Sequence, residues 1–181
     1  WGGTVVGGRL TAIAKCGVAE DLSREIDPAG GGPFNPFMVE SLTVNLGERS
    51  YPICFGVDVA SVVRAQVDTL VAEGRKVMVV TDRNVAHLQL EALRDMFGGQ
   101  PTLVLDPGEE TKSLRELGRV LDFLAENRVD RGGVLFAVGG GVIGDLAGFA
   151  AASYLRGSEV YQVPTTLLAR HFGIVYAPGD K

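Results

Sequence analysis

Residues 134–149 constrain the fold of this chain more than any other stretch. They begin with the uninterrupted apolar run Val134 to Val138, which is typical of a strand covered on both faces. The glycines from Gly139 to Gly141 follow, and they allow a sharp turn with no Cβ in the way of a ligand. A helix of small residues is predicted from Leu146 to Ser153. A strand, a glycine turn and a helix N-terminus in this order can bind an anion, most often a phosphate.

The same turn fits the spacing of a dinucleotide-binding fingerprint. Its glycines read Gly139-x-Gly141-x-x-Gly144. In the usual arrangement this motif follows the first strand of the sheet, and an acidic residue stands about 20 residues later. Here the motif comes late in the chain, and position 164 is Pro164. Spacing alone therefore leaves two interpretations open: a phosphate site, or a turn that only packs a helix against a sheet.

The composition is that of an ordinary globular protein. Of the 181 residues, 46% are hydrophobic and 22% are charged, and the net charge of −5 argues against a nucleic-acid partner. Cys16 and Cys54 show no C-x-x-C spacing, so we expect neither a disulfide nor a zinc site. No apolar run has the length of a membrane span, and no secretory signal is recognisable. These features predict a cytoplasmic protein without a membrane partner.

The first 37 residues differ from the rest of the chain. The chain begins with Trp1 rather than methionine, and residues 27–36 have the Pro- and Gly-rich composition of a linker. Met38 follows directly. Our hypothesis is that the natural protein starts near Met38, and that residues 1–37 are a foreign or disordered leader.

From Ser41 onward the hydrophobic pattern predicts regular elements. Alternation predicts a β-hairpin of residues 42–46 and 51–55. Further strands are expected at 76–80, 102–105, 134–138 and 159–163, and helices at 59–71, 88–97, 114–127 and 146–153. Strands and helices that alternate in this way predict an α/β, Rossmann-like fold with a mainly parallel sheet and helices on both faces, preceded by the β-hairpin.

The helix at 114–127 carries a start signal. Ser113 and Glu116 have the spacing of a capping box, in which Ser113 caps the helix and Glu116 reaches back to the amide of Ser113. Leu114 begins the apolar stripe that we expect to face inward, and the stripe continues through Leu117, Val120, Leu121 and Leu124.

Polar or glycine-rich loops follow the expected strands. They are Asp82–Asn84, Glu109–Lys112, Gly139–Asp145 and Thr165–Thr166. Ligands of open parallel sheets bind beyond the carboxyl ends of the strands, so these loops should converge on one site. Each loop also has an ordinary interpretation: Asp82 as a helix cap, Glu109 and Glu110 as a solvated turn, and Thr165 as an N-cap.

Several segments together resemble 3-dehydroquinate synthase. The closest are residues 139–157 and 162–169, which have the spacing that the family shows. Residues 41–47, 81–85 and 108–113 agree as well, so the resemblance covers roughly residues 39–169. It implies a domain organisation with an NAD-binding domain at 38–169 and an unmatched tail at 170–181.

The resemblance implies an NAD-dependent lyase of the shikimate pathway. The family converts 3-deoxy-D-arabino-heptulosonate 7-phosphate, a small sugar-acid phosphate, into 3-dehydroquinate and phosphate. NAD performs the hydride chemistry, and a divalent metal, zinc or cobalt, acts as the Lewis acid. The resemblance also suggests a homodimer.

The resemblance assigns roles to individual residues. The residues expected to contact NAD are Asp82, Asn84, Glu109 and Lys112 on the adenosine side, Gly141, Val142, Ile143, Gly144 and Asp145 at the pyrophosphate and ribose, and Thr165 and Thr166 near the nicotinamide. Arg156 would face the anionic substrate, because a guanidinium group suits a carboxylate or a phosphate. Its ordinary interpretation is a surface arginine after a helix.

The match stops after Ala169. The acid and the lysine that the family carries next are absent, and so are the glutamate and the histidines that ligate the metal. Of the histidines, His87 lies in a predicted helix and His171 in the unmatched tail. We therefore expect the NAD-binding half of a 3-dehydroquinate synthase, inactive alone and without metal ligands. The alternatives are another sugar phosphate cyclase and a non-catalytic nucleotide-binding fragment.

Overall fold

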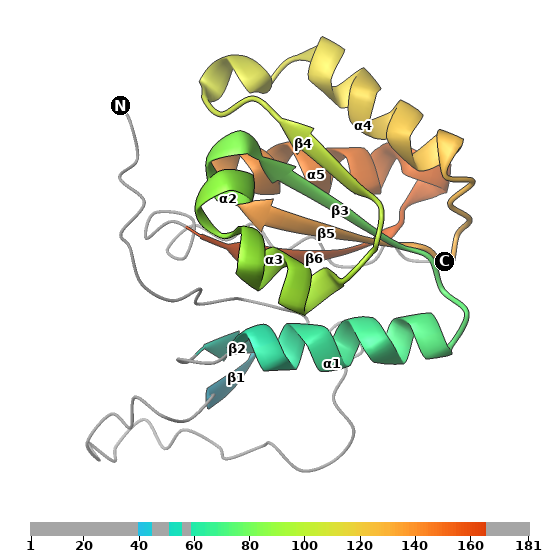
Figure 1. Ribbon diagram of the computed structural model, residues 1–181. Helices are drawn as coiled ribbons and strands as arrows, with labels where there is room; N and C mark the ends of the chain where they lie inside the picture. The colour runs from blue at the N-terminus through green and yellow to red at the C-terminus, as the bar shows by residue number, and fades with distance from the viewer. Residues whose placement is uncertain (1–39, 45–50, 56–58, 166–181) are drawn as a thin grey trace.

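The computed structural model describes residues 40–44, 51–55 and 59–165 (Figure 1). The expectations for the leader at 1–37, the start at Met38, Thr166, His171 and the tail at 170–181 lie outside these residues. The elements in chain order are β1 (Glu40–Val44), β2 (Tyr51–Phe55), α1 (Val59–Ala72), β3 (Val77–Asp82), α2 (Arg83–Leu88), α3 (Leu90–Phe97), β4 (Thr102–Leu105), the 3₁₀ turn η2 (Glu109–Thr111), α4 (Leu114–Glu126), β5 (Val134–Gly139), α5 (Gly141–Ser153), the 3₁₀ turn η3 (Tyr154–Arg156) and β6 (Glu159–Pro164).

The first two strands form the predicted hairpin. β1 and β2 pair antiparallel as a separate two-stranded sheet, with Leu42 opposite Ile53. The other strands form a parallel sheet in the order β4-β3-β5-β6. The prediction of a hairpin followed by a parallel sheet is therefore confirmed.

Helices cover both faces of the parallel sheet, as predicted (Figure 1). Side chains of a strand alternate between the two faces, so Phe136 and Val138 of β5 face one core while Leu135 and Ala137 face the other. The first core lies against α1, α2 and α3, and the second lies against α4 and α5. All residues of β3 and β5 are buried, which explains their unbroken apolar runs.

The chain changes face between β3 and β5, the two central strands. The helices after β3 pack on one face of the sheet, and the helix after β5 packs on the other. The loops that leave the carboxyl ends of these neighbouring strands therefore diverge. Such a point in an open parallel sheet is the expected place for a ligand, and here it lies between Asp82 and Gly139.

Two predicted helices differ from the observed ones. The helix expected at 88–97 begins earlier and is broken at Gln89, whose φ of −126° and ψ of 27° lie outside the helical region. The helix expected at 146–153 begins at Gly141 instead. Burial of Ile143 and Leu146 against the sheet outweighs the low helix propensity of the glycines.

The predicted capping box is only half correct. The amide of Glu116 donates a hydrogen bond of 3.3 Å to Oγ of Ser113, so Ser113 caps α4. The carboxylate of Glu116 does not reach back, because it accepts hydrogen bonds from Arg115 and Arg119 while the amide of Ser113 donates to the carbonyl of Thr111. The expectation that Leu114 faces inward is also wrong, since 86% of Leu114 is exposed.

None of the helices in the described part of the chain has the length and apolar character that a bilayer span requires.

Candidate functional site

The glycine turn is tightly packed on its inner side. Gly139 ends β5, is buried, and has its carbonyl bonded to the amide of Thr165 at 2.9 Å. A Cβ on Gly139 would lie 2.8 Å from both Cβ and Cγ1 of Ile143 in α5. Thus Gly139 serves the packing role that the sequence left open, because it lets α5 approach the end of β5.

Replacement of Gly139 by alanine should destabilise the fold. The added methyl group meets the branched Cβ of Ile143, which the helix backbone holds in place. We expect a loss of about 1–3 kcal/mol in the free energy of unfolding, the usual cost of an overfilled core. Urea denaturation would measure it. A Gly139→Ala variant as stable as the parent chain would contradict this account of the turn.

The outer side of the same turn is open. A Cβ added to Gly141, the first residue of α5, would meet no atom within 4 Å. Gly140 is the N-cap of the helix and supplies no side-chain hydrogen bond. The first amides of a helix have no acceptor within it, and they carry the positive end of the helix dipole. The N-terminus of α5 therefore presents uncapped donors to solvent beside a residue without a side chain.

Thr165 lies next to this turn and has a polar atom that lacks a partner. Its amide donates to the carbonyl of Gly139. Its Oγ1 is the one buried side-chain polar atom without a hydrogen-bond partner among the residues that the structure describes. An unsatisfied buried hydroxyl costs free energy unless a ligand or water completes it. Thr165 is therefore suited to donate to, or accept from, a molecule bound at the glycine turn.

Asp82 and Asn84 follow β3 at the switch point. Asp82 is the N-cap of α2, and its Oδ1 accepts the amide of Val85 at 3.0 Å, so its ordinary interpretation is confirmed. Its side chain is buried, and its second carboxylate oxygen remains available as an acceptor. Asn84 is exposed in the first turn of α2.

Lys112 joins the loop after β4 to α5. Its ammonium lies 2.9 Å from Oδ2 of Asp145 and 3.3 Å from Oε2 of Glu109. The hydrogen bond to Asp145 is the largest cause of a raised pKa of Lys112; partial burial lowers that pKa, and Glu109 raises it further. Lys112 is therefore a cation at neutral pH, held beside the first turns of α5. Glu109 is exposed, as the interpretation of Glu109 and Glu110 as a solvated turn requires. Glu109 also forms an ion pair with Lys112.

The other predicted residues of α5 differ in position. Val142 is partly buried, and Ile143 is fully buried beneath Gly139. Gly144 lies against Gln162 of β6, because a Cβ there would be 3.2 Å from Oε1 of that residue. Only the backbone amides of Val142 and Ile143, and not their side chains, are suited to an anion.

The structure does not bring Arg156 together with these residues. Arg156 is exposed and follows the C-terminus of α5, while the glycine turn precedes its N-terminus. The 13 residues of α5 separate the two by about 20 Å. An anion held at the glycine turn is therefore out of reach of Arg156 in the same chain. A contact between Arg156 and the substrate stays a prediction.

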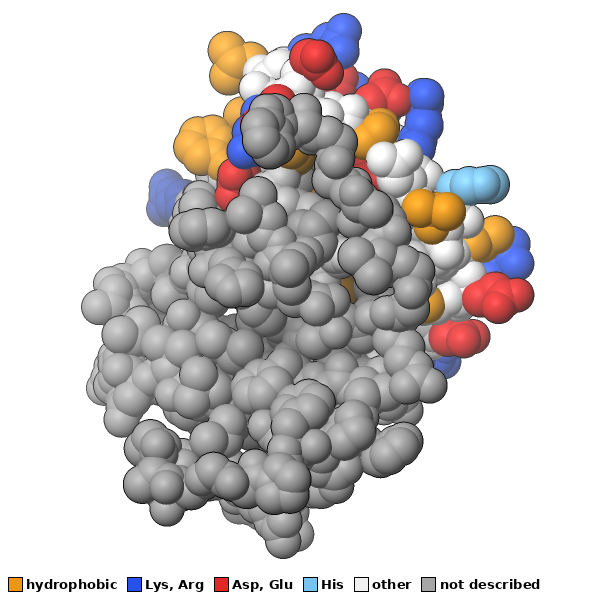
Figure 2. Space-filling view, turned by 90° about the vertical axis from the view of Figure 1, so that its left-hand side faces the viewer, with side chains coloured by type: hydrophobic (Ala, Val, Ile, Leu, Met, Phe, Trp, Pro, Cys, Tyr) orange, Lys and Arg blue, Asp and Glu red, His pale blue; other side chains and the backbone are white. Residues whose placement is uncertain are grey.

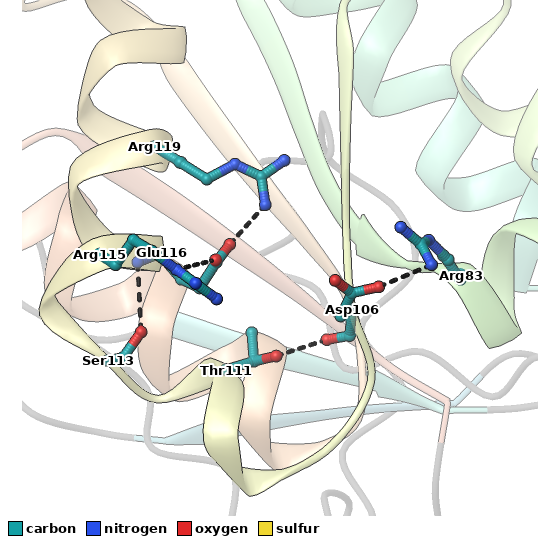
Figure 3. A network of polar contacts seen from close by, with 7 residues as sticks. All are labelled: Arg83, Asp106, Thr111, Ser113, Arg115, Glu116 and Arg119. Atoms are coloured by element: carbon teal, nitrogen blue, oxygen red, sulfur yellow. Dashed lines mark hydrogen bonds and ion pairs between the residues drawn. The ribbon is translucent and has the colours of Figure 1, made fainter.

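Three polar contacts of the site were not predicted from the sequence. The hydroxyl of Thr81 donates to the carbonyl of Val138 at 2.8 Å and ties the ends of β3 and β5 together. The hydroxyl of Thr111 donates to the carbonyl of Asp106 at 2.6 Å, and Arg83 pairs with the Asp106 carboxylate at 2.9 Å (Figure 3). A single threonine, at the end of a strand like Thr81 or in a loop like Thr111, has no sequence pattern that would reveal such a bond in advance.

Charged groups of both signs are visible on the described part of the edge that carries this site. Figure 2 views the molecule from the carboxyl ends of the strands, and the described side chains visible there include acidic and basic groups close to one another. Within the described ranges, no group of three or more His, Cys, Asp or Glu side chains could hold a metal ion. The described site can bind an anion at the α5 amides and accept hydrogen bonds from hydroxyl groups through Asp82, Glu109 and Asp145.

An open parallel sheet with an uncapped helix N-terminus at its switch point defines the Rossmann-like class of α/β domains. Residues 102–174 match the family described as 3-dehydroquinate synthase N-terminal. The chain is 61% identical over 132 residues to 3-dehydroquinate synthase of Opitutus terrae, and 46% identical over 149 residues to that of Rhodospirillum rubrum. The matched part of the chain is therefore similar to the N-terminal part of 3-dehydroquinate synthases, as its motifs predicted.

These alignments include 73% and 80% of this chain but only 37% and 38% of the two relatives. The chain thus spans a little over a third of the length of these curated relatives. Among solved structures, 2-deoxy-scyllo-inosose synthase has a TM-score of 0.59 at 24% identity, over 74% of this chain and 38% of its own. Another structure of 2-deoxy-scyllo-inosose synthase, complexed with carbaglucose-6-phosphate, NAD⁺ and Co²⁺, has a TM-score of 0.51 at 21% identity, over 68% of this chain and 35% of its own. These similarities confirm the predicted fold.

Proposed function

We propose that this chain is the NAD-binding portion of a 3-dehydroquinate synthase, a phosphate-eliminating lyase of aromatic amino acid biosynthesis. The observation that carries the proposal is the open, uncapped N-terminus of α5 at the switch point of the sheet. It lies within residues 102–174, which match the family described as 3-dehydroquinate synthase N-terminal. In 2-deoxy-scyllo-inosose synthase, whose fold this chain shares, a complex with NAD⁺ is known.

The described residues fit the parts of NAD. The amides of Gly141, Val142 and Ile143 suit the pyrophosphate, since they are uncapped and Gly141 leaves the approach free. Lys112 adds a positive charge beside them. The unpartnered hydroxyl of Thr165 suits a polar group of the nicotinamide half. When bound, NAD supplies reversible hydride transfer with a substrate hydroxyl.

The ribose hydroxyls of the adenosine half require acceptors, and carboxylates supply them. Asp82 keeps one oxygen free after capping α2, and Glu109 lies across the turn next to Lys112. Asn84 is exposed at the same end of β3 and suits the adenosine side. In this arrangement Asp82, Asn84 and Glu109 face the adenosine half, and the N-terminus of α5 faces the pyrophosphate.

The described residues do not fit a divalent metal. We propose that the sugar-acid phosphate substrate and the metal bind to the complete 3-dehydroquinate synthase, of which this chain is the NAD-binding portion. Arg156 remains our candidate for a substrate anion contact, and we propose a homodimer as the assembled form. Another sugar phosphate cyclase is the less favoured function, because 2-deoxy-scyllo-inosose synthase shares only 24% identity with this chain.

Calorimetric titration with NAD⁺ tests the proposal. The 181-residue chain should bind one NAD⁺ per chain and should release no phosphate from 3-deoxy-D-arabino-heptulosonate 7-phosphate when zinc or cobalt is added. The second result is expected because the chain spans little more than a third of its relatives. A chain that gives no NAD⁺ response would instead be a module for another ligand. Phosphate release would show that the 181-residue chain already contains a complete catalytic site.

A further inference from the structure

Lys112 lies in the loop that connects β4 to α4. The loop runs from Asp106, after β4, to Ser113, which caps α4, and its one regular turn is η2. Lys112 reaches from this loop to Asp145 in α5. Glu109, Glu110 and Lys112 are exposed, so packing of their own side chains does not hold them. Other interactions must therefore hold the loop backbone at Lys112 in place.

Thr111 fixes it. Thr111 is buried, with only 4% of it accessible, although its sequence neighbours Glu110 and Lys112 are exposed. Its Oγ1 donates to the carbonyl of Asp106 at 2.6 Å, which closes the loop on itself (Figure 3). The amide of Thr111 donates to the carbonyl of Gly108 at 3.1 Å, and its carbonyl accepts the amide of Ser113 at 2.8 Å. Three hydrogen bonds of one residue thus hold both ends of the loop.

Asp106 also forms an ion pair with the first residue of α2. Asp106, whose carbonyl accepts the Thr111 hydroxyl, pairs through its carboxylate with Arg83 at 2.9 Å. Arg83 is the first residue of α2 and follows directly on Asp82. The loop that carries Lys112 is therefore connected through Thr111 and Asp106 to the end of β3, where the other half of the site begins.

We propose that Thr111 is a positioning residue for cofactor binding: its hydroxyl sets the Lys112 ammonium at the N-terminal turns of α5. The inference rests on the proposed function, since it takes Lys112 as the positive charge beside the pyrophosphate of NAD. The hydrogen bonds of Thr111 among the described residues go to Asp106, Gly108 and Ser113, and none of these residues is expected to touch NAD. Loss of its hydroxyl acts through Lys112, because the loop then moves the ammonium away from Asp145.

The test compares Thr111→Val, which keeps the shape and removes the hydroxyl, with Thr111→Ser, which keeps the hydroxyl. Titration of each 181-residue variant with NAD⁺ should give a Kd about three- to tenfold weaker for T111V, the usual effect of one hydrogen bond, and within about twofold of the parent for T111S. Thr102→Val is the matched control. It removes a hydroxyl that donates to the carbonyl of Gln100 at 3.0 Å, at the other end of β4, and should leave the Kd unchanged.

A double-mutant cycle with Lys112→Gln separates positioning from general stability. In the K112Q background, T111V should cause no further loss of NAD⁺ affinity, because the group it positions is gone. Equal losses in both backgrounds would overturn the inference, and so would T111V with the affinity of the parent chain. A parent chain that does not bind NAD⁺ would overturn the proposed function and this inference together. Parent binding with an unaffected T111V would overturn only the inference.

Discussion

Substitution of Gly141 by valine is expected to abolish NAD⁺ binding while the chain remains folded. The added side chain enters the open space in front of the α5 N-terminus, where a Cβ would meet no neighbouring atom of the described residues within 4 Å. Its Cβ therefore has room among the described residues, and the side chain occupies the approach of a pyrophosphate to the first helical amides. We expect the Kd for NAD⁺ to rise by about 100-fold or more, which is about 2.7 kcal/mol. Calorimetric titration measures the loss, and urea denaturation measures the stability.

Gly118→Val is the control for this substitution. Gly118 lies in the middle of α4, and its Cβ would likewise meet nothing within 4 Å. Valine is a better helix former than glycine by roughly half a kcal/mol, so this variant should be at least as stable as the parent chain and should bind NAD⁺ equally well. If G141V bound NAD⁺ like G118V, the α5 N-terminus would not be the pyrophosphate site.

Substitution of Phe136 by alanine should have the largest effect on stability. Phe136 is fully buried in the centre of β5, stacks on Tyr161 with ring centroids 4.8 Å apart, and meets Phe97 edge-on at 5.2 Å. Removal of a buried phenyl ring leaves a cavity and usually costs about 3–5 kcal/mol. A domain of this size has only about 5–15 kcal/mol in total. We therefore expect F136A to unfold at a much lower urea concentration.

Phe149 offers the matched control for that loss. It lies on α5, the helix that follows β5, but 55% of it is exposed. Phe149→Ala removes the same atoms from a partly solvated position and should change the free energy of unfolding by less than about 1 kcal/mol. Similar losses for F136A and F149A would contradict the placement of Phe136 in the core between the sheet and α3.

The sheet could be predicted because its central strands are buried on both faces. Residues 77–80 and 134–138 are apolar without interruption for that reason. The boundaries of the helices could not be predicted as well from the sequence. No glycine or proline marks the break at Gln89, and the neighbouring Leu88 and Leu90, which look like part of an inward stripe, are 56% and 45% exposed. Whether a leucine is inside depends on what packs against it, and a sequence pattern does not contain that information.

The site could be predicted as a set of loops but not as a set of contacts. Parallel strands bring Asp82, Lys112 and Gly139 to one edge, and in the structure Lys112 forms an ion pair with Asp145 there. The sequence did not show that Thr111 anchors the loop, or that Arg156 lies at the opposite end of α5. Both depend on where the chain goes after a strand, and that follows from tertiary packing.

The pairing of β3 with β5 also determines at which stage of folding the site forms. Thr81 and Val138 are hydrogen-bonded neighbours although they are 57 positions apart in the chain. Contacts between residues so distant form slowly, because the intervening segment must be ordered before the contact repays its entropy. A peptide that contains the glycine turn alone therefore has no site. A cofactor that binds only the completed sheet stabilises the folded chain by mass action, so NAD⁺ should slow proteolysis of the whole domain and not only of the turn.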